Sequence, residues 1–268
     1  MRFTVVVDNN VPPGAKAAFR GEHGLAVLIE TGANKILFDT GQSDLVIYNL
    51  GLLGVHPRDL DAIVLSHGHY DHTGGLPAVL AMAGKRIPVF SHPDIFTPRF
   101  SVAEKNCKYV GVPFTREHLV RLGADFRGIE EPMELVPNLW ISGPVPRETA
   151  YEEGDARLVV PTEPSDAEGC CEANGFQKDP LTDDMAIYIR CSQGLIVLGG
   201  CAHSGIINMV NHGLKVTGSI KVHGLLGGTH LGPTLEPQQN ATMAALEWFN
   251  PDFIASNHCT GFAMMSRL

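Results

Sequence analysis

Short apolar runs separated by turn residues dominate the first third of the chain. Thr4–Val7, Leu25–Thr31 and Lys35–Asp39 are β-branched or apolar runs typical of strands, and Gly32-Ala33-Asn34 predicts a hairpin between the last two. Ala62–Leu65 predicts a buried strand that leads directly into a histidine-rich segment.

Helical segments and a further strand complete this block. Helices are expected at Asp44–Leu50 and Leu76–Ala83, and Pro88–Ser91 predicts another strand. Strands therefore alternate with helices after the first hairpin, as in a mixed sheet with helices on one face.

The same order of elements returns in the last third. Strands are expected at Met185–Arg190, Leu195–Leu198, Val222–Leu226 and Phe253–Ala255, with helices at Ile206–His212 and Gln238–Phe249. Two blocks of strands followed by helices predict an αββα sandwich, an α/β (α+β) fold in which two mixed β-sheets are flanked by helices.

The middle of the chain, at about 93–183, is rich in proline, glycine and charge and is expected to be irregular. A long irregular segment inside a compact domain is either a lid or binding loop, or a variable surface excursion. Nothing in the composition marks a linker, and 44% of the 268 residues are hydrophobic. The chain is therefore expected to form one large domain over residues 1–268 with a lid-like insertion.

The net charge and the lack of targeting signals limit the kinds of partner and the compartment that we expect. A net charge of −9 and a pI of about 5.7 disfavour nucleic acid, because duplex binding needs a basic surface. No run of 18 apolar residues is present, so no membrane partner is expected. The N-terminal segment lacks the pattern of a signal peptide, and six cysteines in this length form no dense disulfide framework. We expect a cytoplasmic protein with a small-molecule substrate; a homo-oligomer stays open.

The segment from Ser66 to Gly75 carries the candidate chemistry. His67, His69, Asp71 and His72 lie within six residues, directly after an apolar strand. Neutral imidazole and carboxylate suit zinc, iron or manganese. In an extended loop His67 and His69 lie on one side, and Asp71 and His72 turn with the chain toward a second position. An exposed turn with chance histidines is the alternative, which this spacing disfavours.

This HxHxDH motif resembles the signature of the metallo-β-lactamase superfamily. Further segments are similar to the branch named for 7,8-dihydropterin-6-methyl-4-(β-D-ribofuranosyl)aminobenzene-5′-phosphate synthase: Asp8-Asn9, His23-Gly24-Leu25, Ile36–Gly41, Gly199–His203, Leu226–Leu231 and His258–Gly261. The resemblance implies that His67 and His69 hold a first metal ion, and that Asp71, His72 and His258 hold a second. A capped strand end or a core histidine is the alternative for His258.

The chain departs from the superfamily pattern at two ligand motifs. The loop before the second hairpin, Pro180–Asp184, has no histidine, and the strand end reads Gly200-Cys201-Ala202-His203. Cys201 thus stands where the superfamily has a bridging aspartate, and His203 is a candidate to complete the first site. A thiolate is a good zinc ligand. The alternative is that Cys201 is a small buried strand residue.

The remaining candidates have less defined roles. His230 ends a strand and is a candidate catalytic residue beside Asp71, as a substrate contact, a proton donor or a replacement ligand. His92 is either near the rim of the site or an ordinary surface imidazole. The resemblance implies that Asp39 orients the histidine loop, and a turn-starting role is the alternative. The histidines that lack ligand neighbours in the sequence are not expected in the site: His23, His56, His118, His212 and His223.

Three functions follow. Two metal ions about 3.5–4 Å apart share a hydroxide that attacks a phosphoester, lactone, thioester or amide, with Asp71 orienting it; zinc is the expected ion, with iron or manganese as alternatives. The resemblance also implies a transferase of the pterin-synthase type that releases pyrophosphate. A non-catalytic metal or redox sensor, in which Cys170, Cys171 and Cys201 matter, is the third. We find no Gly-x-Ser-x-Gly elbow and no P-loop.

Overall fold

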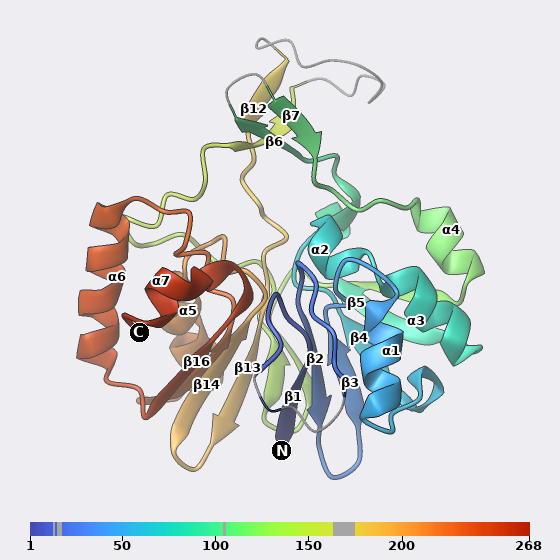
Figure 1. The fold of residues 1–268 in the computed structure, drawn as a ribbon. Helices are drawn as coiled ribbons and strands as arrows, with labels where there is room; N and C mark the ends of the chain where they lie inside the picture. The colour runs from blue at the N-terminus through green and yellow to red at the C-terminus, as the bar shows by residue number, and fades with distance from the viewer. Residues whose placement is uncertain (13, 15–17, 104–105, 163–174) are drawn as a thin grey trace.

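Two six-stranded sheets form the centre of the computed structural model, which describes residues 1–12, 14, 18–103, 106–162 and 175–268 (Figure 1). In spatial order, the first sheet contains β1 (Arg2–Val7), β2 (Ala26–Glu30), β3 (Lys35–Phe38), β4 (Ala62–Val64), β5 (Ile87–Ser91) and β8 (Ala124–Gly128). The second contains β16 (Phe253–Ser256), β15 (Val222–Gly227), β14 (Gly194–Gly199), β13 (Ala186–Cys191), β10 (Leu139–Ile141) and β9 (Met133–Val136). Each sheet mixes parallel and antiparallel pairs.

Helices cover the outer face of each sheet (Figure 1). α1 (Leu45–Leu52), α3 (Leu76–Ala83) and α4 (Arg116–Arg121) lie on the side of the first sheet, and α5 (Ile206–Thr217) and α6 (Glu236–Phe249) on the side of the second. The short α2 (Tyr70–Thr73) and α7 (Gly261–Met265) follow β4 and β16. Short 3₁₀ turns occupy Pro57–Asp59, Pro93–Phe96 and His258–Thr260. The predicted αββα sandwich is confirmed.

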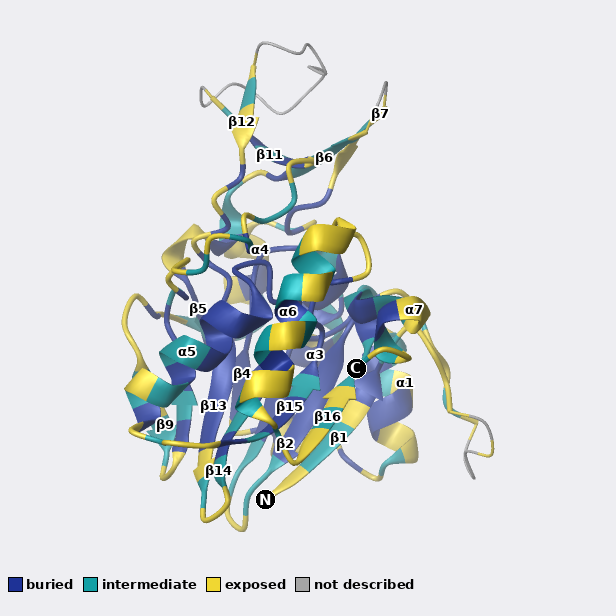
Figure 2. Cartoon of the chain, turned by 90° about the vertical axis from the view of Figure 1, so that its left-hand side faces the viewer, coloured by how far each residue is buried: buried dark blue, intermediate teal, exposed yellow. Residues whose placement is uncertain are grey.

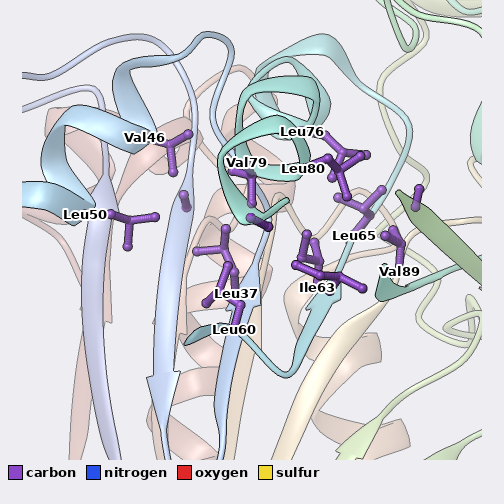
Figure 3. Packing of buried hydrophobic residues seen from close by; sticks show 14 of the residues in the cluster. Leu37, Val46, Leu50, Leu60, Ile63, Leu65, Leu76, Val79, Leu80 and Val89 are labelled. Carbon is purple, nitrogen blue, oxygen red and sulfur yellow. The ribbon is translucent and has the colours of Figure 1, made fainter. Parts of the chain in front are cut away.

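The interior between the sheets is made by alternate residues of the strands. In β2, Val27 and Ile29 face the second sheet, while Ala26 and Leu28 face the helices, so both faces of the strand are buried. Figure 3 shows the outer layer of this packing, where side chains of α1 and α3 meet those of β3 and β4. The buried positions gather in the two central sheets (Figure 2), which gives the strand ends a rigid base.

A small third sheet stands beyond one edge of the sandwich (Figure 1). Its order is β12 (Phe176–Lys178), β11 (Leu158–Pro161), β6 (Phe100–Ala103) and β7 (Asn106–Tyr109), all antiparallel. Within this sheet the ring of Phe100 packs against two other rings. Its centroid lies 5.3 Å from that of Tyr109 and 5.2 Å from that of Phe176. We call these four strands the overhanging sheet.

The segment at about 93–183 is more regular than its sequence predicted. It supplies β8 to the first sheet, β9 and β10 to the second, and all of the overhanging sheet. These strands are only three to five residues long, and several pair with partners far away in sequence, so local pattern does not reveal them. Cys170 and Cys171 lie outside the described residues. Every helix among the described residues is too short or too polar to span a bilayer.

Candidate metal centre

The candidate ligands meet where parallel strands of both sheets end. β3, β4 and β5 run parallel in the first sheet, and β14, β15 and β16 run parallel in the second. The loops after β3 and β4 carry Asp39 and the HxHxDH motif, and the loops after β14, β15 and β16 carry the remaining candidates. Carboxyl ends of parallel strands are the usual place for a site in an open α/β sheet.

A buried carboxylate holds the histidine loop. Asp39 Oδ1 accepts the Ser66 backbone N–H at 2.7 Å, and Oδ2 accepts the Ser66 hydroxyl at 2.7 Å. The same Oδ2 lies 2.7 Å from His72 Nδ1, so the other ring nitrogen of His72 faces the site. This is the orienting role that the resemblance implied for Asp39.

Three imidazoles form the first candidate position. Ligand atoms of His67, His69 and His203 all lie within 4.8 Å of one another, and all three residues are buried. His69 Nε2 and both ring nitrogens of His203 have no hydrogen-bond partner among the described residues. Buried polar atoms are normally paired, so these nitrogens fit a metal ion.

Neutral rings are what such a position needs, because only an unprotonated nitrogen binds a metal ion. Burial lowers the pKa of His69 to about 3. Burial also lowers the pKa values of His67 and His203 well below the usual range, and neighbouring histidines add to both shifts.

A second position lies around Asp71 and His72. His72 Nε2 is 3.1 Å from Cys201 Sγ and 3.2 Å from His258 Nε2. Asp71 Oδ2 is 3.4 Å from His258 Nε2. Ligand-type atoms that converge this closely in a buried place fit a cation between them.

The charges of this second position favour a cation as well. Burial alone would raise the pKa of Asp71, but His72, His23 and His258 hold it well below the usual range. Burial lowers the pKa of His72, yet the carboxylates of Asp39 and Asp71 raise it to about 9. The Asp71 carboxylate is therefore ionised, and in the metal-free chain His72 carries a proton beside it, which an ion bound at Nε2 would replace.

His258 is fixed by the beginning of the chain. Its backbone N–H donates to Asp8 Oδ1 at 2.9 Å, and its Nδ1 lies 2.8 Å from Asn9 Oδ1. The ring therefore presents Nε2 to Asp71 and His72. His258 has a φ of 51°, and Asp39, Ala202 and His230 at the site are left-handed as well.

His23 lies at the site, although its lack of ligand-type neighbours in the sequence predicted otherwise. Its Nε2 is 3.2 Å from Asp71 Oδ2, and its ring is 5.3 Å from that of His258. The sequence around His23 shows no ligand-type neighbour because these contacts join residues far apart in the chain. Only the tertiary fold brings them together.

Of the remaining candidates, His230 lines the cavity at the histidines and His92 does not. His92 begins the 3₁₀ turn at Pro93–Phe96, where its Nδ1 accepts the Asp94 N–H at 3.1 Å, and it does not line the cavity at the histidines. His230 does line that cavity, and its Nε2 lies 3.6 Å from Asp155 Oδ2. Cys259, which sequence reasoning did not select, also lines it.

The loop that lacks the superfamily histidine supports the site from behind. Asp183 Oδ2 accepts the Gly68 backbone N–H at 2.8 Å, inside the HxHxDH motif. Arg99 bridges Asp179 at 2.9 Å and Asp183 at 2.8 Å, and all three side chains are buried. Asp184 Oδ2 accepts both the backbone N–H and the hydroxyl of Ser204 at 2.6 Å, next to His203.

A cavity of about 260 Å³ opens at the cluster. The overhanging sheet and its flanks contribute Lys108 and Arg157 to the lining of this cavity. Lys108 Nζ lies 3.2 Å from Tyr70 Oη, and Arg157 is paired with Asp155. Its volume lies just below the roughly 300–1,000 Å³ of typical ligand pockets, so it suits a small substrate.

Two mixed sheets with outer helices, and histidine and carboxylate side chains at their strand ends, define an αββα architecture with a candidate metal centre. Residues 20–160 match the model of the metallo-beta-lactamase superfamily, and the chain belongs to this superfamily.

Relatives extend the match to nearly the whole chain. The chain is 32% identical over 256 residues to 7,8-dihydropterin-6-methyl-4-(beta-D-ribofuranosyl)-aminobenzene-5'-phosphate synthase of Methanocaldococcus jannaschii, covering 93% of this chain and 84% of the relative. It is also 32% identical to the uncharacterized protein MJ0448 of the same organism, covering 98% and 92%. Among solved structures, it is similar to Tm1679, a metal-dependent hydrolase of the beta-lactamase superfamily, with 25% identity, 98% and 90% coverage and a TM-score of 0.78.

Proposed function

We propose that this chain is a dinuclear metal-dependent hydrolase of a small substrate, with phosphorylated molecules as the first class to test. The observation that carries the proposal is the set of buried imidazole nitrogens of His69 and His203 that have no hydrogen-bond partner in the described chain. Together with the converging atoms of Asp71, His72 and His258, they support two adjacent cation positions.

The proposed ligands divide between the two positions. His67, His69 and His203 hold the first ion, and Asp71, His72, His258 and Cys201 hold the second. Zinc is the expected ion because nitrogen, carboxylate and thiolate ligands suit it, with iron and manganese as alternatives. Two such ions, when bound, activate water and polarise the bond that it attacks.

Asp71 is the proposed catalytic carboxylate. It lines the cavity and is ionised, since its pKa is held well below the usual range despite burial. His23 and His258 contact Oδ2 of this carboxylate, which fixes its orientation. In this position it can accept a hydrogen bond from the attacking water and so orient it.

His230 offers two roles in the same cavity. Burial lowers its pKa, but Asp155 and Cys259 raise it to about 9, so the ring is protonated at neutral pH when no ion is bound to it. A protonated ring can donate to a leaving group. Both ring nitrogens nevertheless lack a hydrogen-bond partner among the described residues, which favours a ligand role.

A transferase is the second candidate. It is favoured by the 32% identity to the M. jannaschii synthase over 93% of this chain. Such an enzyme would join two organic substrates and release pyrophosphate, with its metal ions holding the leaving group.

Metal content and isotope incorporation test the proposal. We expect at least two ions per chain in the wild type and a loss of about one ion in His203→Ala. His212→Ala, a control on α5 whose ring contacts Tyr188, should retain the wild-type content. Turnover of phosphoesters or lactones in ¹⁸O-labelled water should place the label in the product.

Other outcomes decide between the functions. One ion or none in the wild type contradicts the dinuclear site. Pyrophosphate release that requires a second organic substrate, without incorporation of the label, supports the transferase. Tight iron binding without turnover of either kind supports a sensor.

A further inference from the structure

We propose that Cys201, His230 and Cys259 form a third metal-ligand set, suited to a thiophilic divalent ion such as Zn²⁺, beside the two positions above. Ligand atoms of these three residues all lie within 4.8 Å of one another. The inference concerns metal binding and stands whether the chain is a hydrolase or a transferase.

The three residues come from consecutive strands of one sheet. Cys201 follows β14, His230 follows β15 and Cys259 follows β16, and these strands pair in parallel. Their carboxyl ends therefore lie side by side, so the set depends on the packing of the second sheet and not on a contiguous motif.

Gly228 provides the space in which the three loops meet. A Cβ at this position would lie 2.3 Å from Gly200 O, 2.7 Å from Cys259 Sγ and 3.3 Å from Cys201 Cα. Any side chain here would push the two cysteine loops apart. The glycine thus lets both thiols reach one place.

The polar atoms of the set are available for an ion. Both ring nitrogens of His230 are buried without a hydrogen-bond partner in the described residues, as in His203, and the two rings lie 4.2 Å apart. Cys259 Sγ accepts the His230 backbone N–H at 3.2 Å and donates over 3.7 Å to Cys201 O. Neither contact uses up the sulfur, because a thiolate keeps further lone pairs that can bind a metal ion.

Two cysteines and one histidine are a donor set known for zinc sites with an open fourth position. All three residues line the 260 Å³ cavity, from which a further ligand can enter. Cys201 Sγ also lies 3.1 Å from His72 Nε2, so this sulfur stands between the third set and the second position. A thiolate there can serve either ion.

Cobalt substitution tests the set by absorption. Protein stripped with a chelator and reloaded with Co²⁺ should show a thiolate-to-cobalt band in the near ultraviolet. Cys259→Ser should lose about half of it, since one of two thiolates is removed, and His230→Ala should weaken the thiolate-bound ion by roughly tenfold or more, since even indirect partners of a metal site contribute this much. Cys191→Ser is the matched control, because its sulfur donates to Gly194 O at the far hairpin.

A second measurement uses the wild type alone, so it tests the proposal even if the variants fail to fold. In the wild type, Zn²⁺ should protect Cys259 from alkylation, as read from its peptide by mass spectrometry. An unchanged cobalt band in Cys259→Ser, equal alkylation with and without Zn²⁺, or a Cys201–Cys259 disulfide in protein kept under reductant would each overturn the proposal. The ion held by His67, His69 and His203 is counted separately as non-thiolate cobalt, and Cys259→Ser leaves Cys201 in the second position, so loss of those two ions is distinguishable from loss of the third set.

Discussion

The two sheets build their halves of the centre in different ways. The first sheet delivers His67, His69, Asp71 and His72 from a single loop after β4. The second delivers its candidates from separate loops after β14, β15 and β16. A contiguous motif is held by local contacts and is visible in the sequence, whereas a dispersed set exists only once the strands have packed.

The supports of the two halves differ accordingly. A buried carboxylate, Asp39, fixes the first loop through Ser66 and His72. The second half relies on the close approach of loops at Gly228. Removing each support separately tests whether the halves are independent.

The largest effect is expected from Asp39→Ala. It leaves Ser66 and His72 without their buried acceptor, and loss of one partner of a buried charged contact costs about 3–5 kcal/mol. Metal affinity should fall roughly 10–100-fold. Chemical denaturation and metal titration measure the two effects. Asp125→Ala, which removes only exposed ion pairs, should cost about 0–1 kcal/mol; equal losses in both variants would contradict the assigned role.

A smaller effect is expected from Gly228→Ala. The new methyl group meets backbone and sulfur atoms at 2.3–2.7 Å, so the loops must shift at a cost of about 1–3 kcal/mol. The cobalt band of the thiolates should weaken while the position formed by His67, His69 and His203 keeps its ion. Gly51→Ala, in α1 with open space at its Cβ, should instead stabilise by about 0.5–1 kcal/mol. Loss of all ions in Gly228→Ala would show that the halves are coupled.

Per pH unit, the smallest effect is a pH dependence of stability that arises behind the first loop. Burial, with Asp179 and Asp184 nearby, raises the pKa of Asp183 to about 7 although Arg99 opposes the shift. An unfolded aspartate titrates near about 3.9, so between about pH 4 and 7 the folded chain holds a proton that the unfolded chain has lost. The stability from this group therefore falls as pH rises through that window.

Asp183→Asn should remove this dependence. In metal-free protein, the wild type should lose up to about 1.4 kcal/mol per pH unit relative to the variant between about pH 4 and 7. Denaturant titrations at several pH values measure the difference. Parallel curves for the two proteins would show that Asp183 is ionised throughout.

The sequence predicted most of the sandwich because the strands are apolar and the helices periodic. The hairpin of β2 and β3 and the helix at Leu76–Ala83 are confirmed. The strands within 93–183 were missed, because they are only three to five residues long and several pair with partners far away in the sequence. Runs of this length are too short to show a clear alternation of apolar and polar residues, although Leu158–Pro161 is apolar.

Part of the candidate site could likewise be predicted from the sequence, and part could not. The HxHxDH loop was visible as a motif, while His23 and Cys259 reach the cavity only through tertiary contacts. One signal for Cys259 was present: it directly follows His258, a predicted ligand, in the turn His258–Thr260. The signal for His23 was its place in His23-Gly24-Leu25, a segment similar to the synthase branch, although its contact with Asp71 is visible only in the fold.

The anchoring of His258 on Asp8 and Asn9 has a consequence for biosynthesis. These contacts span about 250 positions of the chain, so loop closure between them is among the last entropic costs met in folding. A chain emerging from the ribosome exposes the HxHxDH loop long before His258 is available. Metal captured by that early loop is held by part of its ligands, and tight binding awaits the final strand.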